Sequence, residues 1–298
     1  MSGIPVLSIG ELLWDVFPDG ERLGGAPFNF AAHIRRLGHE VIFITAVGDD
    51  ERGRAARARA EDLGLPLDFL QVAPGQKTGT VTVQLDAAGQ PTFTIHRPCA
   101  YDSVCLSEAD FARIAAFRPA WICFGTLHQT EPRVLSQLLL LFEKNPHAQR
   151  FYDVNLRRDC YTPALVEALL RQADVVKLNE DEMLEIGRMR GRAHASIEEF
   201  CRQWAAEYGW KAVAVTRGAR GGAVLVGGQY AEVDGCPVKV VDAVGAGDAF
   251  AAAFVHGLSE GWPPARVAGF ANRLGALVAS RAGGVPPWTI EELEPASD

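Results

Sequence analysis

Short runs of apolar, mostly β-branched residues recur along this chain, and amphipathic stretches separate most of them. The runs that we expect to form buried strands are residues 41–47, 121–124, 151–154, 175–178 and 212–216. Two helical patterns, at residues 27–37 and 51–63, are followed by Gly38 and Gly64, where a left-handed helix cap is favourable. This alternation predicts an α/β fold with a mostly parallel sheet and helices on both of its faces.

Two segments break the alternation and predict a second, smaller sheet. Residues 12–17 and 78–97 alternate as strands without a helix between them, and the sequence Ala-Ala-Gly-Gln at 87–90 predicts a hairpin turn. We interpret these segments as a small antiparallel β-flap. The last third of the chain predicts strands at 223–226 and 230–233 and helices at 246–258 and 265–280. The 298 residues show no linker, so we expect one domain, 1–298, with lid segments inserted at about 11–24 and 67–102.

The composition argues against several classes of protein. A formal net charge of −8 disfavours a broad surface for nucleic acid or acidic membranes, because phosphate groups attract clustered Lys and Arg. The six cysteines show no C-x-x-C spacing, so neither a zinc site nor a disulfide framework is predicted. The sequence begins without a basic leader, and no apolar stretch reaches the roughly 20 residues of a membrane span. We therefore expect a cytoplasmic protein with reduced thiols and no membrane anchor.

The strongest chemical signal is the turn Gly245-Ala246-Gly247-Asp248, which lies just before a helical segment rich in small residues. Small residues let backbone amides converge on an anion, and the helix dipole adds positive charge there. Asp248 is therefore placed to accept a proton from a hydroxyl that attacks a phosphate. A plain capped helix start is the alternative. A dinucleotide-binding G-x-G-x-x-G pattern fits less well, because Phe250 replaces its third glycine.

A second signal is the sequence GGAPFN at residues 24–29. Its two glycines let the backbone approach a ligand, and Pro27 starts a helix whose first turn presents Asn29. The Asn29 amide can both donate to and accept from a hydroxyl, although a polar helix start is an equal alternative. Asp15 interrupts the apolar stretch 12–17. It is expected either on the wet face of a strand or as a hydroxyl acceptor in a pocket.

Six motifs follow one another in the order seen in ribokinase-like (PfkB) sugar kinases, which the chain resembles over nearly its whole length. They are GGAPFN (24–29), TAVGDD (45–50), DVNLR (153–157), NEDE (179–182), TRG (216–218) and DAVGAGDAF (242–250). The resemblance implies a ribokinase-like three-layer αβα sandwich with Mg²⁺-ATP as phosphoryl donor. It also implies a β-flap lid over the sugar, which in that family often forms a homodimer interface.

The resemblance also implies roles for single residues around the sugar and the phosphoryl group. Asp248 resembles the family's catalytic base, and the anion hole is implied at Gly245, Ala246 and Gly247. The residues that look like ligands of the sugar are Asp15, Gly25, Asn29, Arg97 and Arg157. Arg157 ends the D-x-N-x-R arrangement and is expected to neutralise phosphate charge or hold the sugar, with a surface ion pair as the alternative.

Nucleotide and metal contacts are implied in the same way. Residues that resemble the nucleotide site are Asn179, Thr216, Gly218, Gly221 and Asn272. Asn179 and Glu182 match the N-x-x-E motif, which organises Mg²⁺, indirectly, and phosphate. Without the resemblance, a solvated helix charge is the simpler interpretation of Glu182.

The resemblance also implies a loop that binds a monovalent cation, K⁺, at Asp242 and Val244. The family usually has Thr where this chain has Ala243. The missing hydroxyl weakens the expectation of potassium dependence.

The choice of sugar follows from motif similarity. The segment 93–102 (F-x-I-x-R-P-x-A-x-D), with GGAPFN and D-x-N-x-R, is more similar to fructokinases than to ribokinases or nucleoside kinases. We therefore expect ATP-dependent phosphorylation of a primary hydroxyl of D-fructose. A 2-keto-3-deoxygluconate kinase is the alternative, with Arg97 or Arg157 facing the substrate carboxylate. A non-catalytic sugar or nucleotide sensor is the alternative from another class. Phe17, Phe93 and Ile95 are expected to cap the sugar or meet a second flap, or else to be ordinary strand hydrophobes.

Overall fold

A nine-stranded sheet forms the centre of the molecule in the computed structural model, which describes residues 3–85 and 91–293. In spatial order its strands are β13 (Gln229–Val233), β12 (Gly222–Val226), β11 (Ala212–Thr216), β10 (Val175–Asn179), β9 (Gln149–Asp153), β8 (Trp121–Gly125), β1 (Pro5–Ile9), β4 (Glu40–Gly48) and β5 (Leu70–Ala73). Neighbouring strands from β11 to β5 are parallel, whereas β12 pairs antiparallel with both β11 and β13. The prediction of a mostly parallel sheet is confirmed.

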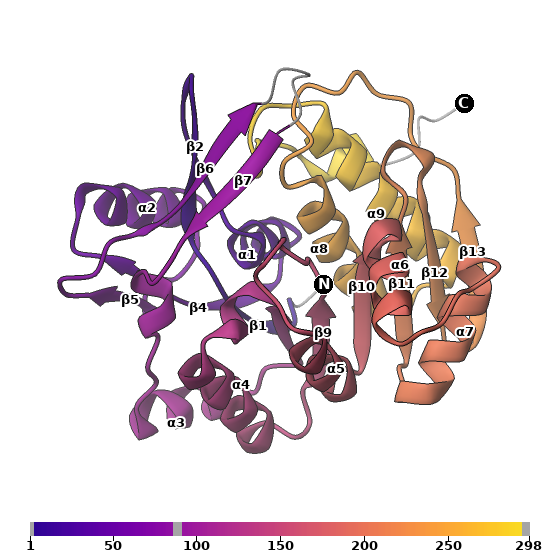
Figure 1. The fold of residues 1–298 in the computed structure, drawn as a ribbon, viewed down its shortest axis with the longest axis horizontal. Coiled ribbons are helices and arrows are strands. Elements are labelled where there is room, and N and C mark those ends of the chain that lie inside the picture. Colours follow the sequence, from indigo (N-terminus) through magenta and orange to yellow (C-terminus); the bar gives the residue numbers. More distant parts are fainter. Residues whose placement is uncertain (1–2, 86–90, 294–298) are drawn as a thin grey trace.

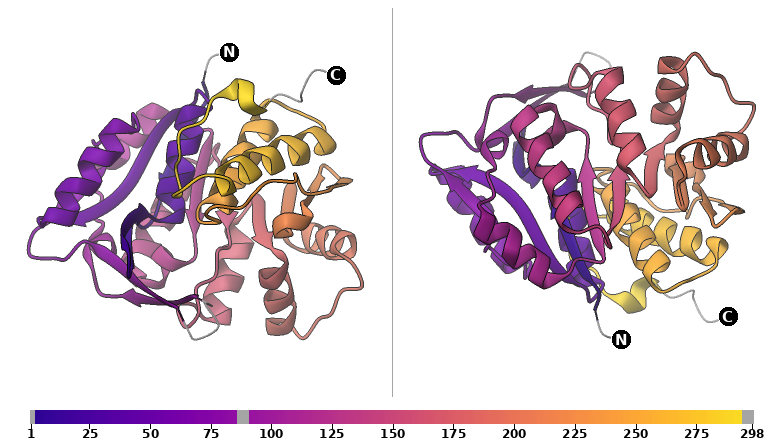
Figure 2. Two further views of the ribbon diagram at one scale, coloured as in Figure 1. Left: turned by 90° about the horizontal axis from the view of Figure 1, so that it is seen from above. Right: turned by 90° about the horizontal axis from the view of Figure 1, so that it is seen from below.

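Helices cover both faces of this sheet (Figures 1 and 2). One face carries α1 (Ala26–Arg36), α2 (Glu51–Asp62), α8 (Ala246–Ser259) and α9 (Pro264–Ala279). The other carries α3 (Glu108–Phe117), α4 (Pro132–Lys144), α5 (Pro163–Gln172), α6 (Glu180–Met189) and α7 (Ile197–Tyr208). Along β1, Val6 packs with the first group of helices, and Leu7 and Ile9 with the second. The expected three-layer αβα sandwich is therefore present.

The second sheet stands over one end of the first and forms the flap (Figure 1). Its strands, in spatial order, are β3 (Gly20–Gly24), β2 (Leu13–Phe17), β6 (Gly79–Leu85) and β7 (Pro91–His96). The two hairpins are antiparallel, but β2 and β6 pair in parallel, so the expectation of a wholly antiparallel flap is corrected. Strand β5, inside the expected lid segment 67–102, pairs instead with β4 of the main sheet. The predicted turn at 87–90 lies outside the described residues.

Local signals explain where α1 and α2 begin and end. Gly38 and Gly64 follow them with φ values of 91° and 74°, which confirms the predicted left-handed positions. The side chain of Asp50 caps α2 by accepting from the amide of Gly53 at 2.7 Å. The same carboxylate accepts from the amide of Thr78 at 2.9 Å, one residue before β6. One acid therefore ties the start of a helix to the base of the flap.

The order of the strands places a crevice beside β1. Strands β8 and β4 flank β1, so the chain proceeds across the sheet in opposite directions from this point. In open α/β sheets, ligands bind at the carboxyl ends of strands near such a reversal. The remaining turns of helix are η1 (Ala100–Ser103), η2 (Leu127–Thr130), η3 (Gly218–Arg220) and η4 (Ile290–Leu293).

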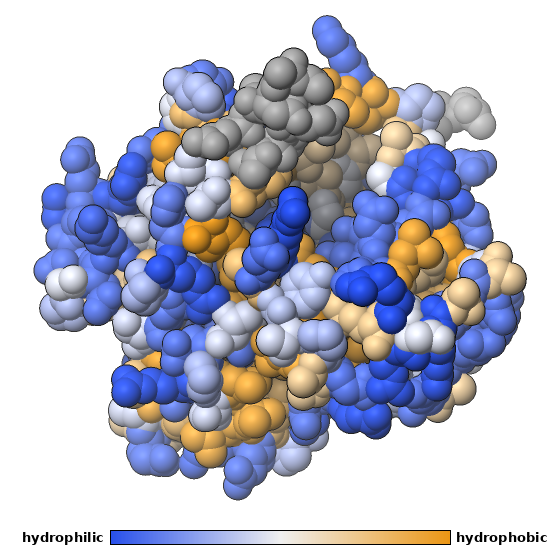
Figure 3. Space-filling view, viewed as in Figure 1, coloured by the Kyte–Doolittle hydropathy of each residue, from blue (hydrophilic) through white to orange (hydrophobic). Residues whose placement is uncertain are grey.

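The face shown in Figure 3 is largely hydrophilic, with a hydrophobic area over α4, where Leu139 is 42% exposed. Among the described helices, none combines the length and the apolar character that a membrane crossing needs.

Candidate active site

A cleft of about 300 Å³ opens between the carboxyl ends of the central strands and the flap. It is lined by Glu11, Leu13, Asp15, Gly25, Ala26, Asn29, Val81, Phe93, Ile95, Leu127, Asn155, Arg157, Lys177, Asn179, Thr216, Ala243, Val244, Gly245, Gly247 and Asp248. Residues from the beginning, middle and end of the chain meet here, and most of the predicted site residues are among them.

The turn that precedes α8 presents free backbone amides. Gly245 has a φ of 78°, which glycine adopts without strain, and the helix begins at Ala246. In the part of the chain that the structure describes, the amides of Gly245, Gly247 and Asp248 donate to no protein acceptor, and that of Ala246 makes only a long bond of 3.4 Å to the Ala243 carbonyl. Free amides at the start of a helix attract anions. The turn is therefore suited to hold a phosphoryl group.

Asp248 lies in the first turn of α8 and contacts α1. The Nδ2 of Asn29 donates to the Oδ2 of Asp248 at 2.8 Å. Burial, together with the charge of Asp153, raises the pKa of Asp248 to about 6, although Lys177, the bond from Asn29 and Arg157 oppose the shift. Such a carboxylate is ionised at neutral pH yet more basic than an ordinary aspartate. It is therefore well matched to accept a proton.

The segment after α9 packs tightly behind Asn29 and the turn. A Cβ added to Gly284 would lie 2.7 Å from the Nδ2 of Asn29, and one added to Gly245 would lie 2.4 Å from the Gly284 carbonyl oxygen. His33 donates from Nε2 to this carbonyl at 3.0 Å, because its Nδ1 accepts from the indole Nε1 of Trp288 at 3.0 Å. Close backbone contacts thus fix the position of the turn relative to Asn29.

A buried ion pair forms the floor of the cleft beneath the turn. Lys177 on β10 is 6% exposed, and its Nζ lies 3.0 Å from the Oδ1 of Asp153 on β9. The same Nζ lies 3.3 Å from the place that a Cβ on Gly247 would occupy. The Asp153 carboxylate and the charges of Glu182 and Asp248 raise the pKa of Lys177 despite its burial. A positive charge is therefore held next to the turn at 245–247.

The remaining predicted sugar ligands, except Arg97, line the same cleft. Burial raises the pKa of Asp15, on the flap strand β2, to about 6, although the charge of Arg157 opposes the shift. Gly25 has a φ of 114°, and a Cβ there would lie 2.3 Å from the Glu11 carbonyl oxygen. Arg157 follows β9 and is exposed, and no ion pair holds its guanidinium within residues 3–85 and 91–293. It is therefore available to an anionic or polar ligand.

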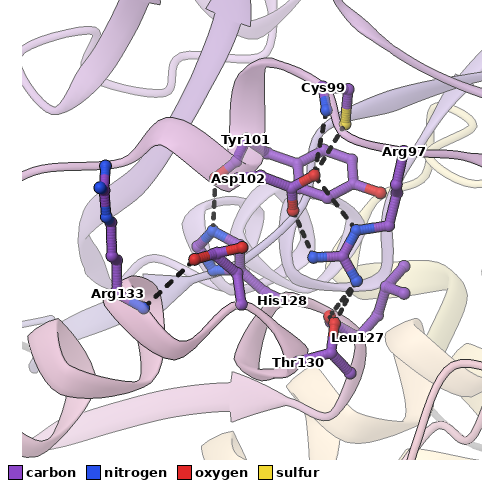
Figure 4. A network of polar contacts seen from close by, with 9 residues as sticks. Arg97, Cys99, Tyr101, Asp102, Leu127, His128, Thr130 and Arg133 are labelled. Atoms are coloured by element: carbon purple, nitrogen blue, oxygen red, sulfur yellow. Dashed lines mark hydrogen bonds and ion pairs between the residues drawn. The ribbon is translucent and has the colours of Figure 1, made fainter.

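Arg97 lies outside the cleft lining. Its guanidinium donates to both carboxylate oxygens of Asp102, to the Leu127 carbonyl at 3.1 Å and to the hydroxyl of Thr130 (Figure 4). These bonds connect the residue after β7 to η1 and η2. Arg97 therefore anchors the base of the flap, and a direct contact between Arg97 and a substrate stays a prediction.

The predicted nucleotide residues divide into two groups. Asn179 and Thr216 are paired at the ends of β10 and β11 and line the cleft. Gly218, Gly221 and Asn272 lie outside its lining. Asn272 on α9 donates from Nδ2 to the Asp234 carbonyl at 2.7 Å, and a Cβ on Gly221 would lie 2.6 Å from the carbonyl carbon of Asp234. Asn272 and Gly221 therefore meet at the loop after β13, and the Gly218 carbonyl accepts from the amide of Gly221 at 3.1 Å.

Asn179 and Glu182 form a capping box at the start of α6. The Oδ1 of Asn179 accepts from the amide of Glu182 at 2.8 Å, and the Oε2 of Glu182 accepts from the amide of Asn179 at 2.8 Å. The other oxygen of Glu182 accepts from the amide of Leu156 at 2.8 Å. Glu182 is 6% exposed, so it is not a solvated helix charge. Both of its oxygens accept from backbone amides, and a contact between Glu182 and a metal ion stays a prediction.

Asp242 organises the predicted cation loop with its own carboxylate. One oxygen accepts from the amide of Val244 and the other from the amide of Gly283, both at 3.0 Å. Val244 lines the cleft, as does Ala243. The described side chains contain no group of three or more His, Cys, Asp or Glu that could hold a metal ion.

Three polar lining residues were not predicted. Lys177 interrupts an apolar strand, and this charge in a buried run was a usable signal. Asn155 belongs to the quoted DVNLR motif and adopts a φ of 40°, which only the structure reveals. Glu11 follows β1 and gave no signal beyond being a polar residue between two strands.

Comparison with known proteins agrees with this geometry. The model of the pfkB family carbohydrate kinase matches residues 11–290. A fructokinase from Escherichia coli is 32% identical over 312 aligned positions, which cover 96% of this chain and 97% of that protein. The crystal structure of fructokinase with bound ATP from Xylella fastidiosa has the same fold, with a TM-score of 0.83 at 22% identity over 97% of this chain and 96% of that one. A fructokinase double mutant from Vibrio cholerae O395, in fructose, ADP and potassium ion bound form, has a TM-score of 0.77 at 27% identity over 95% of this chain and 94% of that one. The chain therefore belongs to the pfkB family of carbohydrate kinases.

Proposed function

We propose that this sugar kinase transfers the γ-phosphoryl group of ATP to a primary hydroxyl of D-fructose. One observation carries the proposal: Asp248 is bonded to Asn29 at 2.8 Å directly beside the free amides of the turn at 245–247. A proton acceptor and an anion cradle at one helix start are what phosphoryl transfer to an alcohol requires. The choice of fructose is supported by the sequence motifs and by the fructokinase relatives.

In this reaction Asp248 takes the proton of the attacking hydroxyl. The pKa of an alcohol lies far above that of Asp248, so the proton moves late, as the new bond to phosphorus forms. The amides of the turn stabilise the charge on the transferring group, and Lys177 adds a positive charge below them. Most of the acceleration then comes from positioning and charge stabilisation.

Magnesium is proposed to enter with the nucleotide. Mg²⁺ neutralises phosphate charge when it is bound, and it commonly keeps several waters and takes only one or two carboxylates. The residues present fit such a site, because the Glu182 carboxylate is bonded to backbone amides and can contact the ion through water.

Potassium is proposed to bind near Asp242 and Val244, with the potassium-bound Vibrio relative as support. Both carboxylate oxygens of Asp242 accept hydrogen bonds from backbone amides, and Ala243 supplies no hydroxyl. We therefore expect weak activation by potassium and residual turnover in its absence.

The flap is proposed to close over the sugar and exclude water, which suppresses hydrolysis of ATP. Phe93 is 52% exposed, and both Phe93 and Ile95 line the cleft from β7, which supports a capping role. The flap is also proposed as a homodimer interface, because β3 and β7 are the outer strands of its sheet among the described residues and each pairs with a neighbour on one side. We place the enzyme in the cytoplasm, in agreement with its six free cysteines.

One observation favours a second substrate. The exposed guanidinium of Arg157 lines the cleft without an ion-pair partner among the described residues, and a sugar acid such as 2-keto-3-deoxygluconate would supply one.

An ADP-release assay at saturating Mg²⁺-ATP tests both candidates, with fructose, 2-keto-3-deoxygluconate, ribose and adenosine as acceptors. The highest kcat/KM with fructose supports the proposal, and the highest value with the sugar acid replaces it. Turnover no higher than the sugar-free blank for all four would favour a non-catalytic sensor.

A further inference from the structure

Glu11 is a buried acid in the wall of the cleft that the mechanism does not use. It lies two residues beyond β1, is 5% exposed, and lines the cleft with Asp15, Asn29 and Asp248. Its Oε2 has no hydrogen-bond partner within the described residues. A buried polar group without a partner is unfavourable and rare in native proteins. A ligand group that reaches this carboxyl would therefore gain a bond that the protein leaves open.

The groups around Glu11 determine what it can bind. Burial, together with the charge of Asp248 on α8, raises the pKa of Glu11 to about 7, although the backbone amides of Glu11 and Ala26 and the charge of Arg157 oppose the shift. Burial raises the pKa of Tyr101 on η1, and the nearby charge of Glu11 contributes to this shift. The Tyr101 hydroxyl is likewise buried without a hydrogen-bond partner among the described residues. A carboxyl near half-protonation both donates and accepts hydrogen bonds, as a hydroxyl does. The matching ligand group is therefore a hydroxyl.

We propose that Glu11 is a further sugar-binding residue, which forms a hydrogen bond with one substrate hydroxyl that is not phosphorylated. The proposal rests on the proposed function, since it takes a sugar to be the occupant of the cleft. A site that is built to bond a substrate hydroxyl discriminates strongly against the analogue that lacks it, because its own polar group is then left unpaired. Glu11 would in this way contribute to the choice among sugars.

A purely structural role for Glu11 is the competing explanation. Gly25 packs against the Glu11 backbone, because a Cβ at Gly25 would lie 2.3 Å from the Glu11 carbonyl oxygen. A hydrogen bond from the Ala26 amide also lowers the pKa of the Glu11 carboxyl. If Glu11 only held this turn in place, its loss would lower thermal stability and disturb the binding of both substrates. If Glu11 instead binds the sugar, its loss would weaken the binding of the sugar and leave the binding of ATP unchanged.

The test compares the wild type with Glu11→Met, which removes the polar group at similar length, and Glu11→Asp, which shortens it. The substrates are fructose and deoxy analogues that each lack one hydroxyl other than the phosphorylated one. We expect the KM for fructose to rise about tenfold or more in both variants, with the KM for ATP unchanged. One analogue should bind the wild type and Glu11→Met almost equally, because the bond is already missing. Glu21→Gln is the matched control, because Glu21 is a flap residue outside the cleft lining that pairs with Arg52. It should leave both KM values unchanged.

Two results would overturn the assignment while leaving the proposed function intact. Additive losses for every analogue would show that Glu11 bonds none of the hydroxyls. A rise in both KM values with a lower melting temperature would show a structural role. Failure of the proposed function looks different, because the wild type itself would then turn over no fructose. Should Glu11→Met fold poorly, Glu11→Asp provides the same comparison, because its shorter side chain keeps the buried carboxyl but withdraws it from the substrate hydroxyl.

Discussion

The Nζ of Lys177 lies 3.0 and 3.2 Å from the two carboxylate oxygens of Asp153, directly across the pair of strands β9 and β10. Both residues are largely buried, and the ammonium group also adjoins Gly247 of the turn that precedes α8. This pair therefore links the stability of the sheet to the charge of the active site.

Removing one member of this pair should be costly. Lys177→Met leaves Asp153 as an uncompensated buried charge, and we expect it to lower the free energy of unfolding by about 3–5 kcal/mol. The double variant Lys177→Met/Asp153→Leu should recover most of this loss while remaining poorly active. Urea unfolding and kcat measured on the same samples check both statements. A single variant as stable as the wild type would contradict the first.

Asp248→Asn removes the proton acceptor and keeps the shape of the side chain. We expect kcat to fall by about 10³-fold or more, the scale of losing a positioned base and its charge. Nucleotide binding should persist, because the amides of the turn are untouched. Calorimetry with ADP and a turnover assay measure the two effects separately. Asp68→Asn, on the surface and paired with Arg113, serves as the control. Near-normal turnover in Asp248→Asn would refute the role of the base.

The activity should fall on the acidic side of a pKa near 6. Asp248 must be ionised to accept a proton, and burial raises its pKa to about 6. Protonation therefore inactivates the enzyme as the pH falls through 6, and kcat reaches a plateau above it. Asp15, whose pKa is also about 6, can steepen the decline in kcat/KM. A profile of kcat from pH 5 to 8 tests this, and activity that rises on acidification would oppose it.

Buried histidines should make the fold sensitive to acid. His33 and His128 are fully buried, and burial lowers the pKa of each to about 4. The unfolded chain binds protons at these residues below about 6.5, whereas the folded protein does so only near 4. The contribution of these two histidines to the free energy of unfolding is complete above pH 6.5. It is lost as the pH falls towards 4, by up to about 3 kcal/mol for each histidine. Urea unfolding at pH 7.5 and 5 measures the loss, which His128→Gln should reduce.

Gly284→Ala should displace Asn29, the hydrogen-bond partner of Asp248, and so disturb the proposed base without contacting Asp248 itself. The new methyl group would lie 2.7 Å from the Nδ2 of Asn29 and push it away from Asp248. We expect kcat to fall about tenfold or more, the scale at which small misplacements act. Gly269→Ala on α9 meets only the flexible side chain of Arg273 and is the control. Equal activity in the two variants would show that this packing is unimportant.

The strands and helices were predictable where one local signal dominated. The apolar runs of β4, β8, β9, β10 and β11 and the glycines after α1 and α2 gave the core of the fold. Strand β5 was missed, because Leu-Gln-Val-Ala is short and lies inside a segment expected to belong to the lid. The parallel pairing of β2 with β6 depends on contacts between distant segments, which periodicity does not encode.

The site was predictable only where a motif carried it. Asp248 and Asn29 were singled out by their glycine-rich turns, and the family resemblance added their roles. Their mutual bond was not predictable, because it joins residues 219 positions apart. Local pattern could not show that Glu11 is buried in the cleft wall, because a single acid beside a strand is usually solvated. Nor could it show that Arg97 is engaged by Asp102 and Thr130 instead of facing the cleft.

The bond between Asn29 and Asp248 also bears on biosynthesis. A ribosome delivers α1 early, but the turn at 245–247 and α8 appear only when most of the chain has been made. In the proposed reaction, the nascent protein therefore lacks its proton acceptor until translation is nearly complete. A product that terminates before α8 should be inactive as a kinase.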